Sequence, residues 1–311
     1  MNKNEYLRVI LTERCNLSCF FCHKEGEKSL NEETNTKEDV LQMIRICVEN
    51  GTKKIKFLGG EPTLVPWLPD IIRELKCKQP NLDVSVVSNG VVQKSVMLRL
   101  VNSGVDRVNI SLHGFDKNLF YKIACGSESQ LDLLLSSISL LVKKEKLGKL
   151  NYVILKGVNE TEFFDVLEFA NKHKLIVDVL NYLGTDADEV ARLRYSFDEI
   201  IQLVESRFTI QQKSKHINPY SLPSTRLFLE GGGVVNLKTT ELKSINCFSS
   251  CSLCQVKEFC TEGIKAIRIS PNGKIRPCVF RDDNCFDLLQ ALRSVGVEET
   301  TKRLRRYLEE L

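Results

Sequence analysis

Three cysteines near the start of the chain have a spacing that suits metal chemistry. Cys15, Cys19 and Cys22 follow the pattern C-x3-C-x2-C, which gives three thiolates within one short loop. A tetrahedral zinc site needs four ligands, usually supplied as two separated pairs. Three close thiolates suit a [4Fe–4S] cluster that leaves one iron without a protein ligand. Such an iron can bind a small molecule, so the loop indicates catalysis, with a structural zinc knuckle as the alternative.

The segments around this loop predict how it is positioned. A strand-like run over residues 7–12 precedes it, and helix-like and strand-like segments then alternate. We expect helices at 36–49, 67–76, 95–103, 130–146 and 160–173, and strands at 54–58, 83–88, 106–112, 151–155 and 175–183. One strand after each helix favours parallel βα units. Right-handed crossovers would curl six such units into a partial barrel rather than a closed eight. The predicted fold class is therefore α/β, a partial (β/α)6 TIM-type barrel with a small C-terminal cysteine-rich extension.

The alternation stops near Asp186, which predicts three regions. We expect the barrel over 1–185, a connecting segment that completes the barrel side over 186–245, and a cluster domain over 246–311. Six cysteines crowd into this third region: Cys247, Cys251, Cys254, Cys260, Cys278 and Cys285. The run Pro271-Asn272-Gly273 between two alternating segments predicts a β-hairpin that returns Cys278 beside Cys251 and Cys254. Such a set suits a zinc ribbon or a second [4Fe–4S] cluster.

Composition excludes several other classes of function. The chain has 311 residues, 42% hydrophobic and 27% charged, and its net charge of +4 is too small to indicate nucleic acid or an acidic membrane as partner. Residues 1–5 lack the apolar region of a signal peptide, and no apolar run approaches membrane-spanning length. Twelve cysteines would be unusual as disulfides in a reducing compartment. We therefore expect a cytoplasmic protein in which most cysteines bind metal.

The motifs together resemble those of the radical S-adenosylmethionine (SAM) superfamily. C-x3-C-x2-C with an aromatic residue before its last cysteine is similar to the superfamily signature, and Gly59-Gly60-Glu61-Pro62 resembles its GGEP motif, which holds the SAM amino group. Glycines also let a ligand approach the backbone, and a carboxylate can take an ammonium group. The resemblance implies that an electron from the cluster cleaves SAM to a 5′-deoxyadenosyl radical, which abstracts hydrogen from a substrate. The SAM-binding residues that it implies are Phe21, Gly59, Gly60, Glu61, Ser111 and Leu183.

Over its whole length the chain resembles the GTP 3′,8-cyclase family of molybdenum-cofactor biosynthesis, in its archaeal form. The matching stretches are 7–15, 22–27, 108–112, 156–159 and 273–278. This resemblance implies a nucleotide substrate, an electron donor such as ferredoxin or flavodoxin, and a second [4Fe–4S] cluster, giving two in all. The cysteines expected at the second cluster are Cys251, Cys254, Cys260 and Cys278. The expected substrate-binding residues are Arg8, Lys56, Ser88, Lys156 and Arg268.

The chain departs from this family at the substrate side. Ala266 and Asp178 stand where family members have arginines, and Cys260 is an extra thiol that can complete a four-cysteine cluster. One alternative is therefore a radical SAM enzyme with a fully ligated second cluster, which modifies a peptide or a sugar or nucleoside. A more remote alternative is a non-catalytic iron–sulfur or zinc protein.

Overall fold

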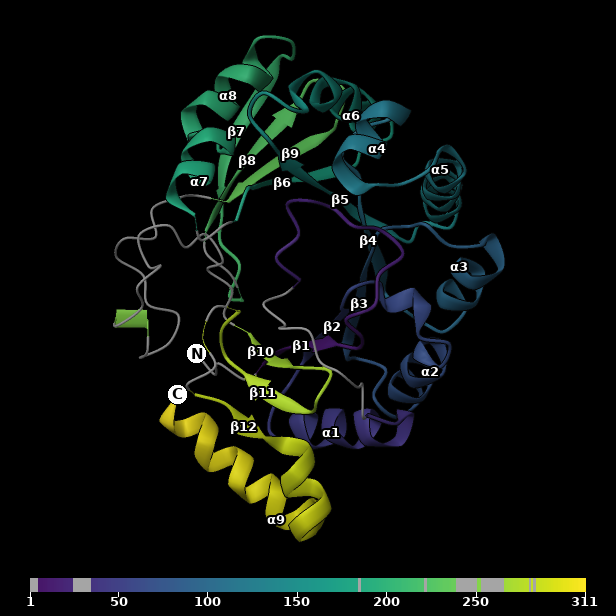
Figure 1. Cartoon of the computed structure of the whole chain (residues 1–311), viewed down its shortest axis with the longest axis vertical. Coiled ribbons are helices and arrows are strands. Elements are labelled where there is room, and N and C mark those ends of the chain that lie inside the picture. The colour runs from purple at the N-terminus through teal and green to yellow at the C-terminus, as the bar shows by residue number, and fades with distance from the viewer. Residues whose placement is uncertain are drawn as a thin grey trace.

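The computed structural model describes residues 5–24, 35–183, 186–220, 223–238, 251–252, 266–279, 281 and 284–311. Its strands form one twelve-stranded sheet in the order β12-β11-β10-β1-β2-β3-β4-β5-β6-β9-β8-β7. Figure 1 shows this sheet curled into an open ring, with helices covering its outer side. The segment after β1 crosses the opening of the ring. The described chain thus has the predicted α/β barrel form.

Six βα units make up the central part of the sheet, as predicted. The strands are β1 (Tyr6–Ile10), β2 (Lys54–Leu58), β3 (Asp83–Ser88), β4 (Arg107–Ser111), β5 (Leu147–Ile154) and β6 (Ile176–Asn181). The helices between them are α1 (Lys37–Glu49), α2 (Leu68–Lys78), α3 (Lys94–Val101), α4 (Lys117–Ala124), α5 (Glu128–Lys143) and α6 (Glu160–Lys172), with a 3₁₀ turn η2 (Pro62–Leu64) after β2. Each of the six strands pairs in parallel with the next.

The sheet extends beyond these units on both sides, which the sequence did not reveal. β9 (Val234–Lys238) pairs in parallel with β6 and continues antiparallel into β8 (Ser224–Leu229) and β7 (Ile210–His216). β10 (Ile267–Ile269) pairs in parallel with β1 and continues antiparallel into β11 (Lys274–Arg276) and β12 (Phe286–Asp287). The turn between β10 and β11 confirms the predicted hairpin, since Gly273 has a φ of 79° and its N–H donates to the Ser270 carbonyl at 2.9 Å. The region boundaries at 185 and 245 stay predictions.

The helix starts follow from local side-chain chemistry. The Thr36 hydroxyl accepts from the Asp39 N–H at 3.1 Å, and the Asp39 carboxylate accepts from the Thr36 N–H at the same distance, which forms a capping box at the start of α1. α4 was not predicted, although Asp116 caps it by accepting from the Leu119 N–H at 2.8 Å. The remaining helices are α7 (Ala187–Leu193), α8 (Phe197–Glu205) and α9 (Leu288–Glu310).

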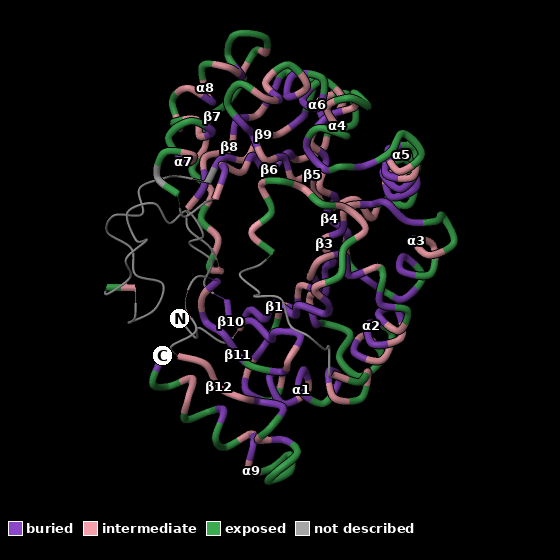
Figure 2. Tube along the Cα trace, in the orientation of Figure 1, coloured by how far each residue is buried: buried purple, intermediate pink, exposed green. Residues whose placement is uncertain are grey.

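Strand alternation sorts the side chains between the core and the interior of the ring. Leu7, Val9, Ile55 and Phe57 are fully buried and belong to one hydrophobic core. Residues between them in sequence, such as Arg8 in β1, face the other way because side chains alternate along a strand. Figure 2 shows buried residues along the strands and exposed residues on the outer helix surfaces. No helix among the described residues is long and apolar enough to cross a membrane.

Candidate active site

The cysteine loop, residues 12–24, lies at the carboxyl ends of the parallel strands and is held there by α4. The Ser18 N–H donates to the Ala124 carbonyl at 3.0 Å, and the Phe20 N–H donates to the Ile123 carbonyl at 3.1 Å. A further bond from the Cys22 N–H to the Cys19 carbonyl, at 3.0 Å, forms a turn within the loop. The loop therefore occupies the end of the barrel where α/β barrels place their chemistry.

The three thiols of this loop have surroundings that suit cluster ligands. The Leu17 N–H donates to Cys15 Sγ at 3.5 Å, and the Lys24 N–H donates to Cys22 Sγ at 3.4 Å. Burial, and the nearby thiols of Cys22 and Cys15, raise the pKa of Cys19 to about 12. Hydrogen bonds to sulfur are a regular feature of iron–sulfur sites.

These observations favour a three-thiolate cluster over a closed zinc site. The described residues contain no group of three histidine, cysteine, aspartate or glutamate side chains placed to hold a metal ion by themselves. Three thiols of one short loop, with amide donors on two of the sulfurs, nevertheless fit a [4Fe–4S] cluster with an open iron. A bound metal would also deprotonate such thiols outright, despite their raised pKa.

The two glycines after β2 are required by the backbone of the cysteine loop. A Cβ atom at Gly60 would lie 2.2 Å from the Arg14 carbonyl oxygen, and one at Gly59 would lie 2.5 Å from the Thr12 oxygen. The Gly60 N–H donates to the Thr12 carbonyl at 2.7 Å, and the Glu61 N–H donates to the Arg14 carbonyl at 2.8 Å. The expectation that these glycines let a ligand approach the backbone stays a prediction, and in this structure their close neighbour is the chain itself. The GGE segment (Gly59, Gly60 and Glu61) therefore holds the start of the cysteine loop in place.

Glu61 joins the ends of two strands through its buried carboxylate. Its Oε1 accepts from the Thr63 N–H (3.0 Å), the Thr63 hydroxyl (2.6 Å) and the Ser88 hydroxyl (2.8 Å). Its Oε2 accepts from the Asn89 N–H at 2.7 Å. Burial raises the pKa of Glu61, and these donors oppose that shift. The carboxylate is thus engaged by four protein donors, so in this structure it acts as a structural link between β2 and β3.

One cavity of about 440 Å³ brings most of the predicted site together. It is lined by the three loop cysteines and by all six expected SAM residues. These six are Phe21, Gly59, Gly60, Glu61, Ser111 and Leu183. Among the expected substrate residues, Arg8, Lys56 and Ser88 also line it. We call the loop and strand-end part of this cavity the rim (residues 12–24, 59–61, 88–89 and 111–113), and the part between the strands the lumen.

Two predicted substrate residues do not line this cavity. The Lys156 Nζ lies 2.7 Å from Glu199 Oε1 and 5.3 Å from the centre of the Tyr195 ring. This ion pair turns Lys156 toward α8 and away from the lumen. Arg268 is buried in β10 beside Arg8, and its guanidinium donates to the Pro277 carbonyl at 3.0 Å. A substrate role for either residue stays a prediction.

The lumen carries an excess of positive charge that the sequence showed only in part. The described Lys and Arg residues that line the lumen are Arg8, Lys54, Lys56, Lys149 and Arg226. Against these five cations stands one described lumen carboxylate, Asp178. Asp178 pairs with Lys149 and accepts from the Asn236 amide at 2.6 Å. The cavity therefore favours an anionic ligand.

Lys56 shows the effect of this charge most clearly. Burial, followed by repulsion from Lys149, Arg8 and Lys54, holds the pKa of Lys56 well below its usual range. Lys54 was not predicted as a site residue because the resemblance pointed only to Lys56 in that strand. Lys149 was not predicted because the fifth strand was expected to begin at residue 151. The period-two alternation of Lys54 with Lys56 in β2 was the signal that could have found Lys54.

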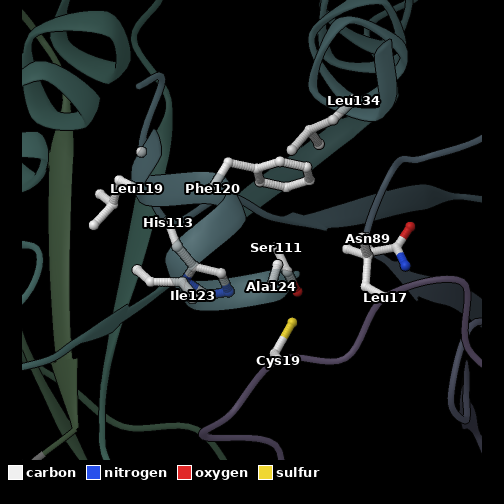
Figure 3. A pocket seen from close by; sticks show the side chains of 11 residues that line it. Leu17, Cys19, Asn89, Ser111, His113, Leu119, Phe120, Ile123, Ala124 and Leu134 are labelled. Atoms are coloured by element: carbon white, nitrogen blue, oxygen red, sulfur yellow. The ribbon is translucent and has the colours of Figure 1, made fainter. Parts of the chain in front are cut away.

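A smaller cavity of about 30 Å³, roughly enough for one water molecule, lies between the cysteine loop and α4. Figure 3 shows the Cys19 thiol pointing from the loop toward Ser111 at the end of β4. His113 lies on the same side, with its ring 4.8 Å from that of Phe21 and its Nδ1 accepting from the Val153 N–H at 3.2 Å. Burial lowers the pKa of His113 to about 4, so the ring is neutral at physiological pH.

The second cysteine group is only partly within the described residues. Cys247, Cys254 and Cys260 lie outside them, whereas Cys251, Cys278 and Cys285 are described and partly buried. The ligand set of a second cluster therefore stays a prediction.

The sequence of the chain is similar to a known superfamily and to named enzymes. The model of the radical SAM superfamily matches residues 9–170. A probable GTP 3′,8-cyclase of Metallosphaera sedula is 32% identical over 314 residues, which cover 98% of this chain and 90% of the relative. One of Methanococcus aeolicus is 29% identical over 295 residues, which cover 93% of this chain and 89% of the relative.

Solved structures with a similar fold are more distant in sequence. Streptococcus suis SuiB bound to S-adenosylmethionine gives a TM-score of 0.62 at 17% identity, covering 97% of this chain and 67% of that one. The enzyme anSMEcpe with bound AdoMet and Cp18Cys peptide gives 0.56 at 15% identity, covering 96% of this chain and 81% of that one. At these identities the likeness supports the fold alone.

Proposed function

Because the chain belongs to the radical SAM superfamily, we propose that it acts on a purine nucleoside triphosphate, GTP in the first instance, as a 3′,8-cyclase. The chain is a radical SAM enzyme, and its cofactors are SAM and two [4Fe–4S] clusters. When bound, the reduced cluster supplies the electron that cleaves SAM, and the resulting 5′-deoxyadenosyl radical abstracts hydrogen from the substrate. Joining C3′ of the ribose to C8 of the base requires the C3′–H bond to break, which is the step such a radical can perform, and this hydrogen ends on 5′-deoxyadenosine. Addition of the C3′ radical to C8 opens the C8–N7 double bond, so one further electron from the reductant and one proton at N7 would complete a product with the mass of GTP.

The observation that carries the nucleotide proposal is the positive charge of the lumen. Arg8 and Lys56 are neighbours in register on β1 and β2, and both line the cavity. Burial and then repulsion from neighbouring cations lower the pKa of Lys56, and a bound anion would relieve the repulsion. A triphosphate supplies several negative charges, and charge-assisted hydrogen bonds to Arg and Lys are among the strong ones.

The residues of the chain divide the work in this proposal. Cys15, Cys19 and Cys22 hold the catalytic cluster, and the GGE segment fixes the loop that carries them. Ser111 and Phe21 at the rim, together with Leu183 after β6, line the cavity and would contact SAM there. The lumen cations hold the triphosphate, so the ribose and base would lie between the phosphates and the rim.

Three finer points belong to the same proposal. The ligands of the second cluster are drawn from Cys251, Cys254, Cys260 and Cys278. A ferredoxin or flavodoxin supplies the electron. The enzyme works in the cytoplasm.

The experiment is an anaerobic incubation of reconstituted protein with dithionite, SAM and GTP. We expect 5′-deoxyadenosine and a cyclised nucleotide of the mass of GTP, both measured by liquid chromatography and mass spectrometry. Parallel reactions with ATP and without nucleotide serve as controls. Formation of 5′-deoxyadenosine without a nucleotide product would contradict the GTP assignment and favour a peptide or sugar substrate. Absence of 5′-deoxyadenosine in every reaction would contradict the catalytic site itself.

A further inference from the structure

Asn89, the first residue after β3, is fixed at three points and reaches the cysteine loop. Its backbone N–H donates to Glu61 Oε2 at 2.7 Å. Its side-chain Oδ1 accepts from the Val91 N–H at 2.9 Å. Its Nδ2 donates to Asn16 Oδ1 at 2.8 Å and lies 3.6 Å from Cys15 Sγ, within hydrogen-bond range for sulfur. Asn89 thus connects the GGE segment, the third strand and the first loop cysteine.

The hydrogen bonds around Asn89 determine which end of its amide faces the sulfur. The two ends of an asparagine amide have nearly the same shape, so their assignment depends on the partners. The Val91 N–H can only donate, so the amide oxygen of Asn89 must face it. The Asn16 Nδ2 in turn donates to the Val91 carbonyl at 2.7 Å, which leaves Asn16 Oδ1 facing Asn89. The two amides therefore lock each other, and the Asn89 N–H group is directed at Cys15.

Asn89 also lies between two negative groups. Glu61 is fully buried, and its carboxylate accepts from the Asn89 backbone N–H, while the Asn89 side chain reaches Cys15 Sγ. A negative charge beside a cluster ligand opposes the arrival of a further electron. An N–H donor on the ligand sulfur has the opposite effect, because it stabilises the added negative charge of the reduced cluster. Hydrogen bonds to sulfur are among the determinants of iron–sulfur reduction potentials.

We propose that Asn89 is a positioning residue that raises the reduction potential of the N-terminal cluster through an N–H···S bond to Cys15. The inference rests on the proposed function in one respect, the role of Cys15 as a cluster ligand. It goes beyond that function because it names a residue that sets how readily the cluster accepts its electron.

The test is a redox titration, followed by electron paramagnetic resonance, of reconstituted wild type, Asn89→Leu and Asn89→Asp. The cluster whose signal changes when SAM is added is the N-terminal one, and the second cluster in the same molecule is an internal control. We expect the equilibrium constant for reduction of the N-terminal cluster to fall about tenfold in Asn89→Leu. For a one-electron couple this lowers the reduction potential by about 59 mV. Asn89→Asp should fall further, because it adds a negative charge. Asn102→Asp makes the same chemical change at the exposed end of α3 and should shift neither cluster.

The possible outcomes separate this inference from the proposed function. An unchanged potential in loaded Asn89→Leu would contradict the inference, and so would weaker SAM binding at an unchanged potential of the SAM-free cluster. If Asn89→Leu does not load iron, Asn89→Asp, which keeps an oxygen for the Val91 N–H, carries the test. Loss of iron in both variants also contradicts it, because tuning a potential is not needed for assembly. A wild-type protein that binds no cluster at Cys15 would instead contradict the proposed function.

Discussion

The rim and the lumen are parts of one cavity, but their polar groups are satisfied in different ways. In the rim, Glu61 is engaged by four protein donors, and the cysteine loop is bonded to the GGE segment and to α4. In the lumen, burial and then repulsion from neighbouring like charges lower the pKa of Lys56. The rim is therefore organised by the protein alone, whereas the lumen is organised for an anion that arrives from outside. Mutations should accordingly affect radical formation at the rim and substrate affinity in the lumen.

The largest effect is expected at Gly60. In Gly60→Ala the new Cβ would lie 2.2 Å from the Arg14 carbonyl oxygen, so the cysteine loop must move. We expect 5′-deoxyadenosine formation to fall at least ~100-fold, because small displacements of reacting groups are costly. Iron content and 5′-deoxyadenosine, measured together, distinguish loss of the cluster from loss of its position.

Gly157→Ala is the matched control for this change. Gly157 has a φ of 73° and no neighbouring atom within 4 Å of an added Cβ, so alanine there costs about 1–2 kcal/mol of backbone strain and no clash. It should keep nearly full activity. Equal losses in the two variants would show that the close approach at Gly60 is not what holds the rim.

A smaller rim effect is expected at Glu61. Glu61→Gln replaces one acceptor oxygen by a donor group in a site that offers only donors. Hydroxyls can rotate, but the Thr63 and Asn89 N–H groups cannot, and one unsatisfied buried donor costs about 1–3 kcal/mol. We expect about 10-fold to 100-fold less 5′-deoxyadenosine, since each 1.4 kcal/mol is a factor of ten. The exposed Glu128→Gln should change nothing, and a Glu61→Gln enzyme of wild-type rate would contradict the proposed link between the strands.

In the lumen, Lys56 should affect substrate and not radical formation. We expect Lys56→Gln to raise the KM for GTP about 10-fold to 100-fold, the range of one charge-assisted contact of about 1.5–3 kcal/mol. Formation of 5′-deoxyadenosine without GTP should stay unchanged. An equal loss in both measurements would show that the rim and lumen are one coupled unit.

The pH dependence of GTP affinity sharpens this point. Because the pKa of Lys56 is lowered, its neutral form appears at a lower pH than for an ordinary lysine. Anion binding needs the charged form, so affinity is full below that pKa and is lost as the pH rises through it. Lys56→Arg stays charged at every accessible pH and should remove this loss. The same KM profile in both proteins would exclude Lys56 as its source.

The smallest effect is expected at Lys156. Its partner Glu199 is exposed and the pair lies outside the cavity lining, so water screens the contact and it contributes little. We expect Lys156→Ala to change the KM for GTP less than about twofold. A tenfold rise would show that the triphosphate reaches beyond the described lumen and would support the role that the family resemblance implies.

The rim was more predictable from sequence than the lumen for a physical reason. The cysteine spacing and GGEP are both local sequence patterns. Cluster ligation requires the cysteines, and the close approach of the Thr12 and Arg14 backbone requires the glycines. Asn89 was not predicted because Ser88-Asn89-Gly90 also reads as a turn, and its sulfur partner lies 74 positions away in the chain.

The outer strands and the lumen charges depend on contacts between distant segments. β9 and β10 joined the parallel run through pairing with β6 and β1, which strand patterns alone do not specify. Lys156 illustrates the converse, since it matches a family position but folds against Glu199. The six parallel strands were predictable because each apolar run and each helix cap is encoded within a short stretch of sequence.

The most direct test is to follow one hydrogen from the lumen to the rim. GTP carrying deuterium at C3′ is incubated anaerobically with the reconstituted enzyme, dithionite and SAM. The 5′-deoxyadenosine is then analysed by mass spectrometry. We predict that it gains one mass unit, because a radical formed at the rim abstracts hydrogen from a substrate held by the lumen cations. Formation of 5′-deoxyadenosine with no deuterium, at GTP concentrations that saturate binding, would contradict this account.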